Sequence, residues 1–313
     1  MNKTTSLALI IMILAVLLGI FHAKSAGVNL FEEQVFELSI KSESDIAAMG
    51  KSFHNNICTL ESDITVENLT ELASREFPFV GVFDGQGYTV TFKGEVSKSL
   101  FGYIGKGGVV KNLNIEVSSC ELAARIGAIL ALENEGTIIN CRVSVDNATV
   151  HSTGAYAAIV THNKGVIKNV YARASFGNSV DESASTSKHP VIGGIAAYNQ
   201  GQILSSISEI SYNGFTEAEK ENIFNNSALN TSLGAVYGAS LSGVTENCAA
   251  IIDTTDYVSD CKNSNIFFAT ADERRNVFSE EMLFTTLGFN SDRWAYQNSM
   301  FTLIEGEDNG FNK

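Results

Sequence analysis

The sequence predicts an all-β protein that folds as a right-handed parallel β-helix (a β-solenoid), with a short N-terminal helix and a C-terminal cap. Three observations lead to this fold class: a glycine-and-asparagine pattern recurs along the chain, a short apolar strand precedes each recurrence, and an alternating strand follows it. A strand, a turn and a second strand cannot bury their own apolar face, whereas stacked units form a continuous core. We therefore expect one coil per repeat.

The repeat is marked by a glycine that is followed four residues later by a polar residue. Three units also carry an Asn two residues before the glycine. Because Asn and Gly both tolerate positive φ, we expect the same turn at one phase of every coil. Four asparagines are predicted to stack as a ladder of amides between coils, a structural role rather than a catalytic one. The turn glycines are Gly108, Gly136, Gly165, Gly201 and Gly243, spaced by 28, 29, 36 and 42 residues, and the ladder asparagines are Asn112, Asn140, Asn169 and Asn247.

The positions of the turn glycines also predict where strands and insertions lie. Two longer intervals mark insertions at residues 179–188 and 212–222, which are polar and lack periodicity. Loops on a solenoid often project from one face and carry the binding function, although a merely tolerated insertion is the alternative. The apolar strands expected before the turns cover residues 126–131, 155–160, 192–197 and 233–237.

The parts of the chain combine into a single predicted β-helix domain over residues 26–304. Its helix should begin at Ser42, with Asp45 placed for a capping box. The predicted divisions of this domain are 34–100 for the N-terminal coils, 101–252 for the repeats, and 253–304 for a C-terminal coil and cap.

The two ends of the chain predict export. Lys3, an apolar run over residues 7–21 and a small-residue site before Ala26 form the three parts of a signal peptide, residues 1–25, cleaved after Ser25. A retained anchor is the alternative, but the run is short for a span of about 20 residues. Residues 305–313 read as a flexible tail. We expect a secreted or cell-surface protein that is not inserted in the membrane after cleavage.

Charge and cysteine content exclude several classes of protein. Removing the signal segment leaves 19 basic against 35 acidic residues, a net charge of −16, which disfavours nucleic acid as a partner. The five cysteines lack a C-x-x-C pair and are odd in number, which argues against a disulfide framework or a structural zinc site. Cys141 and Cys248 share a repeat position and are expected to be buried. A bridge from Cys248 to Cys261 stays open as an alternative.

Two stretches carry a resemblance to a known family. Residues 193–203 read Gly-Gly-Ile-Ala-Ala-Tyr-Asn-Gln-Gly-Gln-Ile, and residues 134–141 read Asn-Glu-Gly-Thr-Ile-Ile-Asn-Cys. Together they resemble the GLUG motif, a repeat of small, apolar and turn residues. Residues 79–90 and 100–104, with Phe-Asp-Gly-x-Gly and Leu-Phe-Gly-Tyr-Ile, are similar to the N-terminal part of proteins that carry this motif.

The resemblance covers residues 34–304 and implies a bacterial-type secreted or surface β-helix. Such proteins occur among adhesins and as the non-catalytic part of immunoglobulin A-cleaving metallopeptidases. The sequence departs from the pattern in lacking Pro-Ile-Gly before Phe79 and in placing Leu241 where an Asn should precede the last turn. The family resemblance by itself implies no enzymatic activity.

The same sequence contains no complete catalytic motif. No two of the five histidines stand four apart around a Glu, so a zinc-peptidase helix is not predicted. The glycine-rich stretch 102–108 lacks the Ser or Thr of a phosphate loop. Asp253, Asp256 and Asp260 are weak candidates for a calcium site, with a solvated acidic turn as the default reading. No catalytic residue and no cofactor site is predicted.

These observations predict an adhesin-like scaffold whose partner is an extracellular protein or glycan, bound through loops and one face of the solenoid. The alternatives are a carbohydrate-active β-helix enzyme, such as a polysaccharide lyase or glycosidase, and a structural subunit of an assembly. Both alternatives rest on the fold class, because the sequence shows no catalytic constellation.

Overall fold

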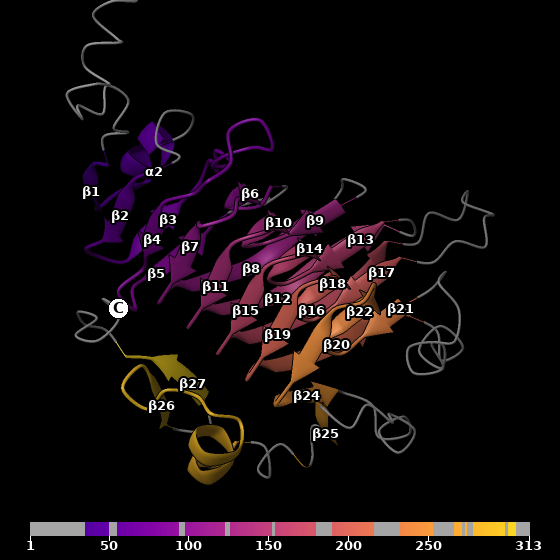
Figure 1. Cartoon of the computed structure of the whole chain (residues 1–313). Coiled ribbons are helices and arrows are strands. Elements are labelled where there is room, and N and C mark those ends of the chain that lie inside the picture. Colours follow the sequence, from indigo (N-terminus) through magenta and orange to yellow (C-terminus); the bar gives the residue numbers. More distant parts are fainter. Residues whose placement is uncertain are drawn as a thin grey trace, which may run out of the picture. The chain divides into compact units, whose positions relative to one another are not determined.

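The structure is a computed structural model of the whole chain (Figure 1). It divides into two compact units, Met1–Phe36 and Glu37–Lys313, and the second unit holds every strand named below. The predicted signal peptide (1–25), the tail (305–313), the calcium candidates Asp253, Asp256 and Asp260, and Cys261 lie outside the described residues. The structure describes residues 35–49, 55–93, 98–122, 126–151, 154–179, 190–215, 232–252, 266–270, 273, 278–297 and 300–304.

Four parallel sheets run along the stack of coils (Figure 1). In four successive coils the chain passes through sheets D, C, A and B in that order, and each strand pairs in parallel with its equivalents in the neighbouring coils. Sheet A contains β1 (Glu37–Ile40), β2 (Ile57–Leu60), β4 (Val82–Asp84), β7 (Val109–Lys111), β11 (Thr137–Ile139), β15 (Val166–Lys168), β19 (Gln202–Leu204) and β23 (Val244–Glu246). Sheet B contains β3 (Ile64–Val66), β5 (Thr89–Phe92), β8 (Asn114–Leu122), β12 (Arg142–His151), β16 (Tyr171–Ser179), β20 (Ile207–Asn213), β24 (Cys248–Ile252) and β25 (Ile266–Thr270).

The two smaller sheets complete the coils. Sheet C contains β6 (Phe101–Ile104), β10 (Ala131–Asn134), β14 (Val160–Asn163), β18 (Ala196–Asn199) and β22 (Tyr237–Ser240). Sheet D contains β9 (Ile126–Ala128), β13 (Ala155–Ala157), β17 (Val191–Gly193) and β21 (Ser232–Gly234). The prediction of an all-β fold built from stacked parallel strands is confirmed.

One detail of the strand prediction was wrong. Each apolar segment before a turn was expected to be a single strand, but it is divided between sheets D and C by a bend. In residues 126–134 the bend falls at Ile129 and Leu130, which are both buried. Two consecutive inward residues break the alternation of a strand, and the chain changes direction there.

The first coils are closed by a helix, as predicted. Helix α2 (Glu43–Met49) follows Ser42, whose hydroxyl donates a hydrogen bond to Asp45 Oδ2 at 2.8 Å. The same carboxylate accepts from the Lys41 amide at 3.0 Å, one residue earlier than in a standard capping box. Ile46 and Met49 are buried against the coils, so the helix covers the apolar interior at this end.

The core is a set of side-chain columns that run from coil to coil. In sheet A the cross-strand register aligns Cys58, Phe83, Val110 and Ile138, all of them fully buried. Cys141 and Cys248 are also buried free thiols, as their shared repeat position predicted. Packing of like positions between neighbouring coils keeps the strands of successive coils in register, apart from a bulge of one residue in β12.

A separate aromatic cluster forms the C-terminal cap. It includes a π-helical turn, η2 (Glu281–Thr286), and an antiparallel hairpin of β26 (Trp294–Gln297) and β27 (Met300–Leu303). Trp294 and Phe301 pack edge to face with their ring centroids 5.8 Å apart. The cluster covers outward residues of sheet B, because Tyr171 on β16 lies 5.5 Å from the Phe301 ring. In the part of the chain that is described, no helix is long and apolar enough to cross a membrane.

Candidate functional site

The predicted ladder asparagines lie at the corner between sheets A and B. Asn112, Asn140, Asn169 and Asn247 all adopt φ of 52°, the left-handed conformation that Asn tolerates better than most residues. The Asn140 amide donates to Asn112 Oδ1 at 3.3 Å, and Asn112 donates to Asp84 Oδ1 at 3.0 Å. The structure thus joins two of the four into a chain of side-chain hydrogen bonds that ends on a carboxylate.

A second asparagine ladder was missed in the sequence reasoning. Asn134 donates to Asn163 Oδ1 at 2.9 Å, and Asn163 donates to Asn199 Oδ1 at 2.9 Å. All three side chains are fully buried at the corner between sheets C and A. The sequence carries a signal for this ladder, since each Asn stands two residues before a turn glycine, but turn chemistry alone also accounts for that pattern.

The turn glycines are required for space rather than for positive φ. A Cβ on Gly136 would lie 2.2 Å from the Gly108 carbonyl oxygen, and one on Gly165 would lie 2.1 Å from the Gly136 carbonyl oxygen. The same backbone approach recurs at Gly201, where a Cβ would meet the Gly165 carbonyl oxygen at 2.1 Å. None of these glycines has a positive φ, so the expected reason for them was wrong: the coils stack backbone on backbone here.

The outer face of sheet C carries a row of functional side chains. The parallel register aligns Tyr103, Glu133, His162, Tyr198 and Ala239 on consecutive coils. We call the four larger residues, Tyr103, Glu133, His162 and Tyr198, the outer row. Each is partly exposed, and neighbouring strands stand about 4.8 Å apart. The row thus presents an aromatic ring, a carboxylate, an imidazole and a second aromatic ring over roughly 14 Å of rigid sheet.

A network of charges surrounds the carboxylate of the outer row. Arg75 pairs with Glu133 Oε1, and Lys164 Nζ lies 3.8 Å from Glu133 Oε2 and 3.4 Å from Glu135 Oε1. The Tyr103 hydroxyl hydrogen-bonds Glu135 and, together with Lys164, holds the pKa of that carboxyl below its usual range. Desolvation first, and this hydrogen bond second, raise the pKa of Tyr103 to about 12. Two carboxylates and two cations leave the network without net charge.

His162 stacks on Tyr198, with ring centroids 4.9 Å apart and planes inclined by 20°. Burial lowers the pKa of His162, and Lys164 and Arg75 lower it further, while Glu133 opposes them. The ring is therefore neutral at neutral pH. Its Nδ1 is buried and has no hydrogen-bond partner in the described residues. The imidazole is therefore an uncharged ring that is held against the stacked tyrosine.

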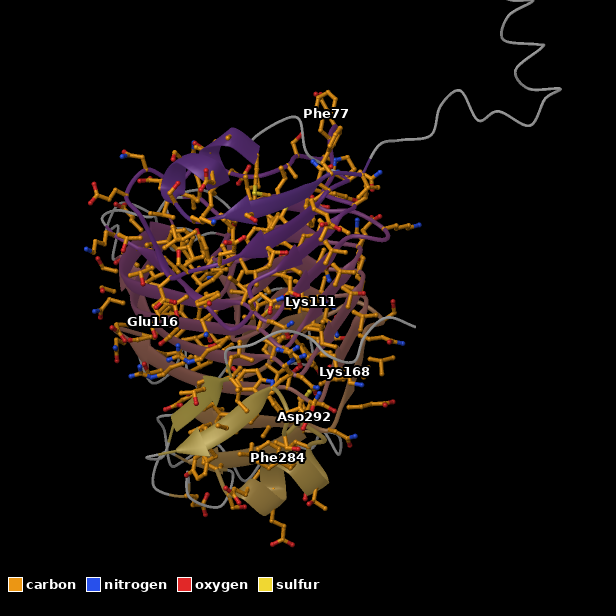
Figure 2. All side chains as sticks on the ribbon, turned by 90° about the vertical axis from the view of Figure 1, so that its left-hand side faces the viewer. Phe77, Lys111, Glu116, Lys168, Phe284 and Asp292 are labelled. Carbon is orange, nitrogen blue, oxygen red and sulfur yellow. The ribbon has the colours of Figure 1, made fainter. Side chains whose placement is uncertain are left out.

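A turn before β6 extends the surface beyond Tyr103. Leu72 bridges to Phe101 and Phe79 bridges to Ile104, which fixes the intervening segment beside strand β6. Ser74 and Phe77 exchange two hydrogen bonds, at 3.0 and 3.2 Å, which tighten the turn between them. The Phe77 side chain, 56% exposed, points away from the coils (Figure 2). Phe77 therefore provides an apolar contact at one end of the outer row.

Two kinds of reactive group, metal ligands and thiols, can be compared with the described part of the chain. No three His, Cys, Asp or Glu side chains there are grouped closely enough to hold a metal ion. The four described cysteines, Cys58, Cys120, Cys141 and Cys248, are buried, and desolvation raises the pKa of each thiol to about 12. Such thiols are poor nucleophiles.

Comparison with known proteins supports the fold. No family model matches the sequence, and no curated protein matches it. The chain is similar to the crystal structure of a candidate immunoglobulin A1 protease from Bacteroides ovatus, with a TM-score of 0.54 and 18% sequence identity. The match covers 88% of this chain and 94% of that chain. At this identity the likeness shows a shared fold, a parallel β-solenoid-like domain.

Proposed function

We propose that this protein is a secreted or cell-surface scaffold of the adhesin type, which binds an extracellular protein through the outer row on sheet C. The observation that carries the proposal is the alignment of Tyr103, Glu133, His162 and Tyr198, flanked by Arg75 and Phe77, on one face. Aromatic residues and Arg dominate the energetic centres of protein interfaces. The four residues of the outer row stand on paired strands, so these side chains lose little conformational freedom on binding.

The finer features of the fold belong to the same proposal. The coils wind as a right-handed β-helix of the GLUG type, because parallel crossover connections are right-handed in about 98% of cases. The repeated Asn-x-Gly turns and the structural likeness to the Bacteroides ovatus protein support this relationship. The predicted signal peptide at residues 1–25 would bring the domain outside the cell. N-terminal sequencing of the exported chain should begin at Ala26.

A protein partner is favoured over a glycan by the shape of the surface. His162 and Tyr198 stack on each other, so their broad ring faces are turned along the row rather than outward. A sugar chain needs outward ring faces, whereas a protein can contact ring edges, the paired charges and Phe77 together. Because the charge network is balanced, we expect binding to depend only weakly on salt.

The proposal is tested by binding to immobilised extracellular proteins, including immunoglobulin A1, fibronectin, collagen and mucin. We expect micromolar or tighter binding to at least one of them, and loss of at least about tenfold in affinity for Arg75→Ala and for Phe77→Ser. Phe267→Ser is the matched control, because Phe267 on β25 is also an exposed aromatic residue, 43% accessible.

Three results would contradict the proposal. One is the absence of binding to the whole panel at micromolar concentration, and another is an equal loss for the Phe267→Ser control. The third is binding that disappears when the partner is enzymatically deglycosylated, which would make a glycan the partner instead. Culture fractionation tests the location, since export predicts the chain in the medium or on intact cells.

A further inference from the structure

A second surface feature lies on the outer face of sheet B, away from the outer row. It begins with a β-bulge. On β12 and β16 the register runs from Val145 opposite Ala174 to Ala148 opposite Phe176, so β12 contains one residue more than its partner. A bulge re-aims side chains, and here Asp146 and Asn147 are both exposed.

The bulge forms one wall of a pocket of about 160 Å³. Its floor comes from two cross-strand pairs, Arg173 opposite Glu209 and Ser175 opposite Ser211. Neighbouring coils therefore supply the pocket with one guanidinium, two carboxylates and two hydroxyls. The residues that line it include Asp146, Arg173, Ser175, Glu209, Ser211 and Ile251.

Contacts around the pocket orient its polar groups. Arg173 Nη1 lies 3.4 Å from Asp146 Oδ1, and the Tyr171 hydroxyl donates to Glu209 Oε2 at 2.6 Å. The Asn213 amide donates to Ser175 Oγ at 2.6 Å, which leaves the hydroxyl proton of Ser175 available to donate. Ile251 also belongs to the aromatic cluster of the cap, so the apolar side of the pocket is braced by that cluster.

We propose that this pocket binds a single neutral sugar residue. Carboxylates accept hydrogen bonds from neighbouring hydroxyls, the guanidinium and Ser175 donate to sugar oxygens, and Ile251 meets the apolar face of the ring. The formal charge of the lining is −1, from two carboxylates and one guanidinium, which disfavours a uronic acid or a phosphate. The size suits one ring rather than a chain. This site is independent of the protein partner proposed for the outer row.

The experiment titrates the full chain with free galactose, mannose, glucose and glucuronate by calorimetry or saturation-transfer NMR. At least one neutral sugar should bind, and glucuronate should bind more weakly. Arg173→Ala and Asp146→Asn should each weaken binding at least about tenfold. Ser211→Leu, which fills the pocket without removing a charge, should do the same. Unchanged melting of each variant shows that the fold persists.

The matched control is Glu116→Gln. Glu116 lies on the outer face of sheet B, is 51% exposed and pairs with Arg142 at 2.8 Å, but does not line the pocket (Figure 2). The Glu116→Gln variant should bind sugar as tightly as the unmodified chain does. The same result is expected for Tyr198→Ala, because Tyr198 belongs to the outer row and not to the pocket. The assignment is overturned if no neutral sugar binds, if glucuronate binds best, or if the pocket variants bind normally. Loss of sugar binding in Tyr198→Ala would show that the sugar binds at the outer row, and this result would also overturn the assignment to the pocket.

Discussion

The buried ladder of Asn134, Asn163 and Asn199 gives the sharpest test of how the coils are held together. Replacing Asn163 with Ala removes the two 2.9 Å side-chain hydrogen bonds that join three coils. It also removes a 3.3 Å bond from the same amide to the Gln202 carbonyl oxygen. Asn199 Oδ1 keeps a partner, the Gly201 amide at 3.2 Å, but the Asn134 side-chain amide loses the acceptor it has in the structure.

The expected loss follows from these contacts. Two hydrogen bonds contribute about 1 kcal/mol each, and a buried donor left unpaired costs about 1–3 kcal/mol. We expect the free energy of unfolding to fall by about 3–5 kcal/mol. The measurement is urea unfolding followed by far-ultraviolet circular dichroism, which reports on the strands, rather than by fluorescence of Trp294, which reports on the cap.

The control is Asn169→Gly, at the other asparagine corner. Asn169 has φ of 52°, which Gly adopts without strain, and its buried Oδ1 has no partner in the described residues. We expect a change within about 1 kcal/mol. A loss for Asn163→Ala below about 1 kcal/mol, or one equal to that of the control, would refute the role given to the buried ladder.

Three further predictions concern packing and protonation. Gly165→Ala should cost about 3 kcal/mol or more in urea unfolding, because its Cβ meets backbone, whereas Gly107→Ala, with open space around its Cβ, should cost about 1 kcal/mol. Burial raises the pKa of the Cys141 thiol to about 12, so this Cys should resist alkylation at pH 8 until the chain unfolds, and stability should fall as pH rises above 9 toward 12. The pKa of His162, followed by NMR, should lie below its ordinary value, fall further in Glu133→Gln and rise in Lys164→Ala. The folded chain should accordingly lose stability as pH falls from 6.5 toward the lower pKa that His162 has in the folded state. Normal alkylation of native Cys141, or an unshifted His162, would contradict these assignments.

The repeat itself could be predicted from the sequence because the stack imposes it. Backbone contact between coils leaves room only for Gly at positions such as Gly136 and Gly165, and the left-handed corner favours Asn at Asn140 and Asn169. These constraints recur once per coil, so they are visible as a period. Asn163 and its equivalents also recur at a fixed position of the repeat, so their period is visible in the sequence. Their burial is not, because it depends on the bend between sheets C and A.

The outer features could not be predicted in the same way. Glu133, His162 and Tyr198 all stand three residues before a turn glycine, yet their residue types differ, and their alignment depends on the cross-strand register. The position of the cap does have a signal in the sequence. Cys248–Ile252 is an unbroken apolar run, which is typical of a strand buried on both faces, and the cap cluster covers its outer face.

Both proposed sites are built on strands rather than on the insertions that the sequence suggested for binding. The row residues Glu133, His162 and Tyr198 belong to β10, β14 and β18, and the pocket residues Asp146, Arg173 and Glu209 belong to β12, β16 and β20 of the same three coils. Each of these three coils therefore contributes residues to both sites. Because the ladders fix the stacking of these coils, the two sites keep a constant relation to each other. A protein and a sugar on one glycoprotein could then be engaged together only at one spacing, which gives the scaffold a geometric basis for selecting its partner.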